Sequence, residues 1–440
     1  MLFRGPRPLT GPWPMVTVQI PVRDEAHVIG RLLNAVRELD YPNFEVQMLD
    51  DSEDETKGIV AKEVARLRAE SFPIEVLWRR DNFGRKAGAL NDGLKTAKGE
   101  FIAMFDADFV PPSDFLKRIV PAFFESDDIG FAQGRWTFLN ETESWLTRMQ
   151  SLLLSAYMTV EQPARSARGF PFTFNGTGGV WRRTCIDSAG GWHVDCVIED
   201  LDLTCRAWMK GWKFRHYANI TVPCRLPSTL RQFRFQQRRW TKGNAQIFRK
   251  YTLPILFAER PVPEKLALLA HILPKPAGFL LVFLSLLPWH GRCYGLRLAI
   301  GLLAFLTFYS YLRAGHLVRK SFGEVSRGLF PSHFAASVAG TVAFFTGFSL
   351  LSLSVYLQGL FIPSPEYVRT AKGPGYSSPF DSLCYFEILF GFACASISVI
   401  SYFQGRYLGA LFSIPIALCF IAVGALSLLS PERSLRSAND

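Results

Sequence analysis

The chain has 440 residues, of which 49% are hydrophobic and 20% are charged, and its formal net charge is +11 at pH 7. A charged fraction below the ~25% of an ordinary soluble domain, together with a positive mean hydropathy of +0.12, argues against a plain cytosolic globule. The 14% aromatic content excludes a disordered chain. The eight cysteines include no C-x-x-C pair, which argues against a disulfide framework.

The first 105 residues alternate short apolar runs with helical patterns. The N-terminus is positively charged but has no apolar segment, so it is not a signal peptide, and the region before the apolar half is expected to stay in the cytoplasm. Strands are predicted at Val16–Pro21, Glu45–Leu49, Ile74–Trp78 and Phe101–Phe105, and helices at Ala26–Leu39, Thr56–Ala69 and Ala87–Ala97. This rhythm predicts a Rossmann-like α/β domain with a mostly parallel sheet.

Acidic pairs follow two of these strands. Asp50 and Asp51 come directly after the second strand, and Asp106 and Asp108 follow the fourth. Ligands of open α/β sheets bind beyond the carboxyl ends of the strands. Carboxylates held in a turn can converge on a divalent cation whose shell is completed by phosphate oxygens. Aspartates are also common in ordinary turns, but two pairs at neighbouring strand ends favour the cation site.

From Lys265 onward the chain becomes apolar and acidic residues are scarce. Runs of spanning length occur at Leu266–Trp289, Tyr294–Leu312, Phe334–Phe361, Leu383–Phe403 and Tyr407–Leu429. Pro274 and Pro276 interrupt the first run, which indicates a kink or an interfacial segment. The basic loop Arg313–Gly328 is expected on the cytoplasmic side. We expect a membrane domain over residues 265–430, with four spans and one interfacial or fifth span.

Ordered motifs identify a family resemblance. VTVQIPVRDE, MLDDSEDET, RKAGALN and FDADFVPP are followed by FNGTGGVWR, VIEDLDL and LPSTLRQFRFQQRRW. This series resembles the family 2 nucleotide-sugar glycosyltransferases of GT-A fold, and its last motif resembles the signature of their membrane-bound, mostly processive, cellulose-synthase-like members. The later motifs look most similar to mannan and glucomannan synthases. Residues 1–250 are then the cytoplasmic GT-A domain.

The resemblance implies a role for each motif residue. Asp106 and Asp108 would hold Mg²⁺ or Mn²⁺ on the diphosphate, and Asp50 and Asp51 would contact the nucleoside. Lys86 would approach the nucleotide, although a solvated lysine at a helix start is an alternative. Asp200 would be the base that deprotonates the acceptor. Glu199 precedes it, and neighbouring carboxylates can raise one another's pKa.

Gln236, Arg239 and Trp240 form a Q-x-x-R-W motif at spacing i, i+3, i+4, which a helix presents on one face. An indole can stack on the acceptor sugar, an amide can hydrogen-bond it, and a guanidinium can meet the diphosphate. Basic and aromatic neighbours over residues 228–250 also predict a helix at the membrane interface, and both interpretations can hold together. Tyr367–Gly373 resembles a cellulose-synthase gating loop but departs from it at Arg369 and Ala371.

The leading hypothesis is an inverting, membrane-embedded hexosyltransferase that lengthens a β-linked polysaccharide from GDP-mannose or UDP-glucose. A non-processive, ceramide-type glycolipid glucosyltransferase is the alternative enzyme, and a transporter or scaffold with an inactive domain is the alternative class. Expected partners are the nucleotide sugar, a polysaccharide or lipid acceptor, membrane lipids and, as a candidate, a further membrane subunit. No nucleic-acid motif accompanies the positive charge. The expected location is the inner, plasma or Golgi membrane.

Overall fold

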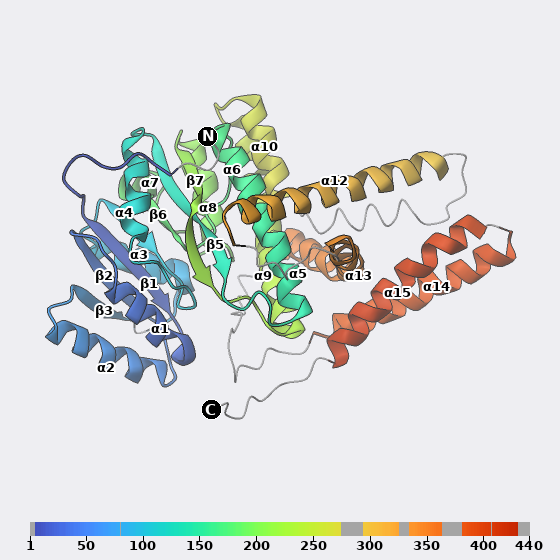
Figure 1. Ribbon diagram of the computed structural model, residues 1–440, viewed down its shortest axis with the longest axis horizontal. Coiled ribbons are helices and arrows are strands. Elements are labelled where there is room, and N and C mark those ends of the chain that lie inside the picture. Colours follow the sequence, from blue (N-terminus) through green and yellow to red (C-terminus); the bar gives the residue numbers. More distant parts are fainter. Residues whose placement is uncertain are drawn as a thin grey trace. The chain divides into compact units, whose positions relative to one another are not determined.

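The computed structural model describes residues 5–79, 81–273, 294–324, 334–362, 381–405 and 407–429 (Figure 1). The chain divides into two compact units. The first comprises Met1–Asn140, Tyr157–Leu226 and Ile247–Ile272, and the second comprises Glu141–Ala156, Pro227–Gln246 and Leu273–Asp440. The long helix α9 (Leu230–Phe257) contributes residues to both units.

A seven-stranded sheet of order β3-β2-β1-β4-β6-β5-β7 forms the centre of the first unit. Its strands are β1 (Val16–Val22), β2 (Phe44–Asp50), β3 (Ile74–Trp78), β4 (Phe101–Met104), β5 (Ile129–Phe138), β6 (Gly179–Arg182) and β7 (Lys213–Cys224). β1 to β4 are parallel, as predicted, whereas β6 runs antiparallel to β4 and β5. β5 and β7 pair in parallel, although they lie far apart in the sequence.

Helices cover both faces of the sheet, and the alternation of side chains along β4 shows why. Phe101 and Ala103 pack into one hydrophobic core with α1 (Ala26–Arg37) and α2 (Thr56–Ala69). Ile102 and Met104 point the other way, into a second core with α3 (Arg85–Thr96) and α8 (Glu199–Met209). A strand buried on both faces reads as a continuous apolar run, which made β4 recognisable in the sequence.

Shorter helices complete the first unit. They are α4 (Phe115–Ile119), the 3₁₀ turn η1 (Val120–Phe124), the π-helical turn η2 (Tyr157–Glu161), α6 (Gln162–Ala167), α7 (Arg183–Ser188) and α10 (Val262–Ile272). The helix predicted over residues 228–250 exists as α9 but continues to Phe257. It is longer because Tyr251 and Ile255, past the predicted end, are buried in the second core.

The second unit is helical, and its apolar runs form helices close to the predicted bounds. It contains α5 (Trp145–Ala156), α12 (Tyr294–Ser321), α13 (Phe334–Phe361), α14 (Leu383–Phe403) and α15 (Tyr407–Leu429). α12 extends beyond the predicted Leu312, because Arg319 in its last turns forms two hydrogen bonds to Glu141 at 2.6 and 2.7 Å. The first part of the predicted basic loop is therefore helical.

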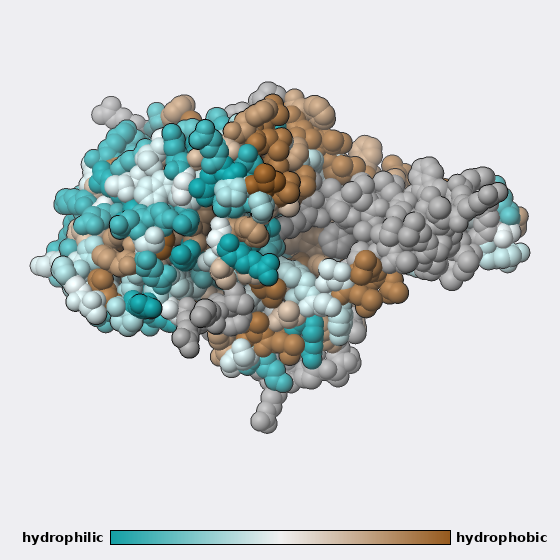
Figure 2. Space-filling model, turned by 90° about the horizontal axis from the view of Figure 1, so that it is seen from above, coloured by the Kyte–Doolittle hydropathy of each residue, from teal (hydrophilic) through white to brown (hydrophobic). Residues whose placement is uncertain are grey.

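Among the described residues, two helical stretches, Ala336–Phe361 and Leu383–Phe403, are long and apolar enough to cross a membrane. A shorter apolar stretch covers Ile414–Leu429. Most of the predicted span Leu266–Trp289, including Pro274 and Pro276, and the whole segment Tyr367–Gly373 lie outside the described residues. In Figure 2, hydrophilic side chains predominate over the first unit, at the left of the view.

Candidate functional site

Asp50 is the last residue of β2 rather than the first residue after it, because it still pairs in register with Val22 and Trp78. Its side chain is buried, and Oδ1 accepts the backbone N–H of Ser52 at 2.7 Å. Burial raises the pKa of Asp50, against the opposing hydrogen bonds from Ser52. The second oxygen, Oδ2, is buried with no hydrogen-bond partner among the described residues. Because an unsatisfied buried acceptor costs about 1–3 kcal/mol, this atom suits a ligand donor.

Asp51 binds an arginine that the sequence analysis did not single out. Its Oδ2 lies 2.7 Å from Nη1 of Arg79, and both side chains are almost fully buried. Burial raises the pKa of Asp51 to about 6, with Arg79 acting in the opposite direction. Nε of Arg79 also donates to Asp92 on α3 at 3.0 Å. Arg79 thereby holds the loop that leads from β3 into α3 and on to Lys86.

Lys86 connects the aspartates after β4 with the start of α8. Its Nζ donates to Oδ1 of Asp106 at 2.7 Å and to the carbonyl oxygen of Gly176 at 2.9 Å, and lies 3.4 Å from Oε1 of Glu199. Burial disfavours the ammonium ion, but Asp106, Glu199 and Asp200 outweigh it and raise the pKa of Lys86. The lysine is therefore charged at neutral pH and does not extend as a solvated side chain.

Asp106 and Asp108 flank the buried Ala107 in the turn after β4, and both aspartates are half-buried. The turn is fixed by the segment that leads into the neighbouring strand β6, because the backbone N–H of Asp106 donates to Oγ1 of Thr177 at 2.9 Å. Half-exposed carboxylates on a pinned turn offer hard oxygen ligands that a ligand or cation can reach.

Asp200 lies in the first turn of α8, which begins at Glu199. Its Oδ1 accepts the backbone N–H of Leu201 at 2.8 Å. A helix N-terminus favours a negative charge in its first turn, so this position supports an ionised carboxylate. Asp202, two residues further along α8, is fully buried.

Gly176 allows these groups to approach one another. Its φ is +76°, which L-residues with a Cβ rarely adopt. A Cβ at this position would lie 3.2 Å from Oδ2 of Asp200 and 3.4 Å from Nζ of Lys86. The residue belongs to the FNGTGG motif, so the motif was visible in the sequence, although the role of its carbonyl oxygen as a partner of Lys86 was not.

The three Q-x-x-R-W residues lie on α9, in the part of that helix that belongs to the second unit. The prediction that this motif lies on a helix is confirmed, and the spacing i, i+3, i+4 then places the three residues on one face of α9. Gln236 is buried, whereas Arg239 and Trp240 are half-buried.

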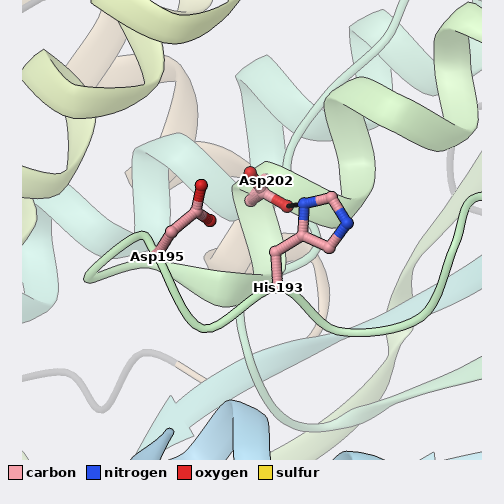
Figure 3. A group of neighbouring side chains, drawn as sticks. All are labelled: His193, Asp195 and Asp202. Atoms are coloured by element: carbon pink, nitrogen blue, oxygen red, sulfur yellow. Dashed lines mark ion pairs between the residues drawn. The ribbon is translucent and has the colours of Figure 1, made fainter.

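A second polar cluster lies beside α8 and includes His193, Asp195 and Asp202, whose ligand atoms lie within 4.8 Å of one another (Figure 3). Such a grouping is compatible with a metal ion. However, Nζ of Lys250 already lies 2.9 Å from Asp195 and 2.8 Å from Asp202. Arg206 also lies 2.7 Å from Asp202, so Lys250 and Arg206 together balance the two carboxylates, and the cluster is better explained as an ion-pair network.

The comparisons with known proteins agree with the fold and the motifs. A family model described as "Glycosyl transferase family group 2" matches residues 101–354, more than half of the chain. The probable glucomannan 4-beta-mannosyltransferase 11 of Oryza sativa subsp. japonica is 44% identical over 250 residues, which cover 56% of this chain and 44% of that protein. Glucomannan 4-beta-mannosyltransferase 2 of Arabidopsis thaliana is 42% identical over 250 residues, covering 56% and 47%. The chain thus spans just under half the length of these relatives.

Among solved structures, the mannosyltransferase PcManGT from Pyrobaculum calidifontis, in complex with GDP-Man and Mn²⁺, superposes with a TM-score of 0.50. The two proteins share 19% sequence identity, and the superposition covers 80% of our chain and 91% of that one. This likeness shows a common fold. The predicted α/β GT-A fold class and the predicted family are confirmed. The chain belongs to glycosyl transferase family group 2.

Proposed function

We propose that the protein is an inverting hexosyltransferase that transfers mannose from GDP-mannose onto a growing β-linked polysaccharide. The observation that carries the proposal is the position of Lys86, whose Nζ contacts Asp106 at 2.7 Å and Glu199 at 3.4 Å. Through this lysine the aspartates after β4 and the Glu199–Asp200 pair belong to one site. A diphosphate-binding turn and a candidate base next to each other are what transfer from a nucleotide sugar requires.

The donor assignment rests on the relatives and on the acids after β2. The two plant relatives are named as glucomannan mannosyltransferases. In our chain, the buried Oδ2 of Asp50 and Oδ1 of Asp51 have no hydrogen-bond partner among the described residues. Both atoms can accept hydrogen bonds from the N–H or O–H groups of a nucleoside. UDP-glucose is the second donor to test, because these acceptors do not by themselves distinguish the two nucleosides.

A divalent cation fits the turn after β4. Asp106 and Asp108 supply two half-exposed carboxylates of the oxygen-donor type that Mg²⁺ and Mn²⁺ prefer. When bound there, the cation supplies positive charge to the diphosphate leaving group. Lys86 already contributes one positive charge at Asp106, so the protein brings its own cation to the same region.

Asp200 is the proposed general base. It takes the proton of an acceptor hydroxyl while that oxygen forms a bond to the anomeric carbon. The bond from the anomeric carbon to the diphosphate oxygen breaks on the opposite face, and the electron pair leaves with the diphosphate. The configuration at the anomeric carbon is therefore inverted. Glu199 contacts Lys86 and holds the ammonium beside the base.

The acceptor side is assigned to α9. The indole of Trp240 would stack on a sugar ring, Gln236 would hydrogen-bond it, and Arg239 would meet the diphosphate. We also propose that residues 265–430 form the membrane domain, for which α13 and α14 are the described candidates, and that residues 1–250 are cytoplasmic. Membrane lipids are then partners, and a further membrane subunit could complete a polymer channel.

The test is product analysis with membranes that contain the protein. They are supplied with radiolabelled GDP-mannose, UDP-glucose or UDP-N-acetylglucosamine, with Mg²⁺, with Mn²⁺ or with a chelator. We expect metal-dependent incorporation of mannose into long polymer that a β-mannanase degrades. Asp200→Asn should reduce incorporation to a small residual rate, whereas Asp187→Asn, at an exposed carboxylate on α7, should leave it unchanged. A single glycolipid product would support the non-processive enzyme instead, and no incorporation from any donor would support a transporter or scaffold.

A further inference from the structure

The first turn of α8 carries a carboxylate that the proposed reaction does not use. Asp202 follows Asp200 by two residues and its side chain is completely buried. Even so, it accepts hydrogen bonds from Nζ of Lys250 at 2.8 Å, from the hydroxyl of Tyr251 at 2.7 Å and from Nε of Arg206 at 2.8 Å. A buried carboxylate with three donors is a rigid anchor, because each donor removes a rotamer that the side chain could otherwise adopt.

Lys250 extends this anchor to the loop that precedes α8. Its ammonium binds Asp195 at 2.9 Å in the loop that precedes α8, and lies 3.8 Å from Sγ of Cys196 in the same loop. Nδ1 of His193 in that loop is 3.5 Å from Oδ2 of Asp202 (Figure 3). The loop leads directly into Glu199, so Lys250 and Asp202 fix both the approach to α8 and its first turn.

The charges in this cluster are balanced. Lys250 and Arg206 supply two positive charges, and Asp195 and Asp202 supply two negative charges. Burial would raise the pKa of Asp202, but Arg206 and Lys250 outweigh burial and lower it. Burial likewise disfavours the charged form of Lys250, but its hydrogen bond to Asp202 raises its pKa. Asp202 and Lys250 are therefore both ionised at neutral pH.

We propose that Lys250, together with Tyr251, is a positioning residue for Asp200. The two α9 side chains hold Asp202, Asp202 holds the first turn of α8, and that turn presents the base. This inference rests on the proposed role of Asp200. On this proposal α9 has two roles: it carries Gln236, Arg239 and Trp240, and through Lys250 and Tyr251 it also positions α8, which carries the base.

The first test compares steady-state kinetics of Lys250→Met, Lys250→Arg and Tyr251→Phe with the wild type. A displaced base should lower kcat on the order of 10- to 100-fold in Lys250→Met, since small misplacements of a reacting group can cost about that factor. The KM for GDP-mannose should stay within about twofold. Lys250→Arg should recover part of kcat, and Tyr251→Phe should lose a few-fold. The matched control is Lys210→Met, at the exposed C-cap of α8.

The second test is a double-mutant cycle with Asp200→Asn. If Lys250 acts through Asp200, adding Lys250→Met to Asp200→Asn should cause no further loss of the residual rate. Equal kcat values for Lys250→Met and wild type, or additive losses in the cycle, would overturn the inference. If Lys250→Met does not fold, as judged by thermal unfolding in detergent, Tyr251→Phe and Lys250→Arg carry the comparison. Absence of transfer by the wild type would instead refute the proposed function.

Discussion

Replacing Lys86 with methionine tests the proposed site most directly. The ammonium makes charge-assisted contacts with Asp106 and Glu199 and a hydrogen bond to the carbonyl of Gly176. A hydrogen bond to a charged group contributes about 1.5–3 kcal/mol. The side chains of Lys86 and Asp106 are 20% and 36% exposed, so solvent screens part of this energy and a total of about 1.5–3 kcal/mol is the reasonable expectation. Such a loss corresponds to a roughly 10- to 100-fold decrease in kcat/KM.

The assay is the initial rate of [¹⁴C]mannose incorporation at several donor and metal concentrations. Lys95→Met is the control, because that lysine lies on the same helix but is 74% exposed and, among the described residues, forms its ion pair with Asp92. Since Lys86 competes with a cation for Asp106, its removal should not raise the metal concentration needed for half-maximal activity. Wild-type kcat/KM in Lys86→Met, or an equal loss in the control, would refute the reasoning.

Three further substitutions test the fold around the site and the helical unit. Gly176→Ala and Gly169→Ala should both introduce backbone strain of about 1–2 kcal/mol, because both glycines have a positive φ. Only the alanine at position 176 places a Cβ against the site. Mannose transfer should therefore fall at least tenfold in Gly176→Ala and stay near the wild-type rate in Gly169→Ala. His216 is buried, and burial lowers its pKa to about 3, so folding favours its neutral form. The contribution of neutral His216 to the free energy of unfolding should be fully present above pH 6.5 and should decrease by about 1.4 kcal/mol per pH unit as the pH drops toward 3. His216→Phe should reduce this pH dependence, measured by thermal unfolding in detergent. Gly347→Leu should overpack the α13–α15 contact and cost about 1–3 kcal/mol, whereas Gly340→Leu, with open space around it, should leave the yield of monodisperse protein unchanged.

The first half of the sheet could be predicted because its signals are local. β1 to β4 are short, largely apolar runs that alternate with helices, a rhythm that predicts parallel strands, even though β4 pairs with β1 rather than with its sequence neighbour β3. β5, β6 and β7 lack such signals. β6 has only four residues, and β5 obtains its partner β7 from about 80 positions further along the chain. The segment between β5 and β7 does not repeat the regular strand–helix alternation of the first half, so their pairing is set by tertiary contacts that no local pattern encodes.

The same distinction holds for the candidate site. The acids at the strand ends were visible because their position relative to the strands indicates a function. The contact of Lys86 with the carbonyl of Gly176 joins residues 90 positions apart, and that of Asp202 with Lys250 joins residues 48 apart. The groups involved are two lysine side chains, a glycine carbonyl and an aspartate side chain, so only the folded chain distinguishes them from solvated groups.

The charge of the site argues for an order of binding that can be measured. Asp106, Asp108, Glu199 and Asp200 carry four negative charges against one positive charge of Lys86, which leaves the group with three negative charges. A nucleoside diphosphate sugar brings two more, so its approach to the free protein is repulsive. A divalent cation on the aspartates offsets that addition. We therefore expect GDP-mannose to bind at least tenfold more tightly with Mn²⁺ than with a chelator, and Asp106→Asn to reduce this dependence. Equal affinity under both conditions, measured by equilibrium dialysis with labelled donor, would show that Lys86 alone compensates the diphosphate and that the aspartates have another role.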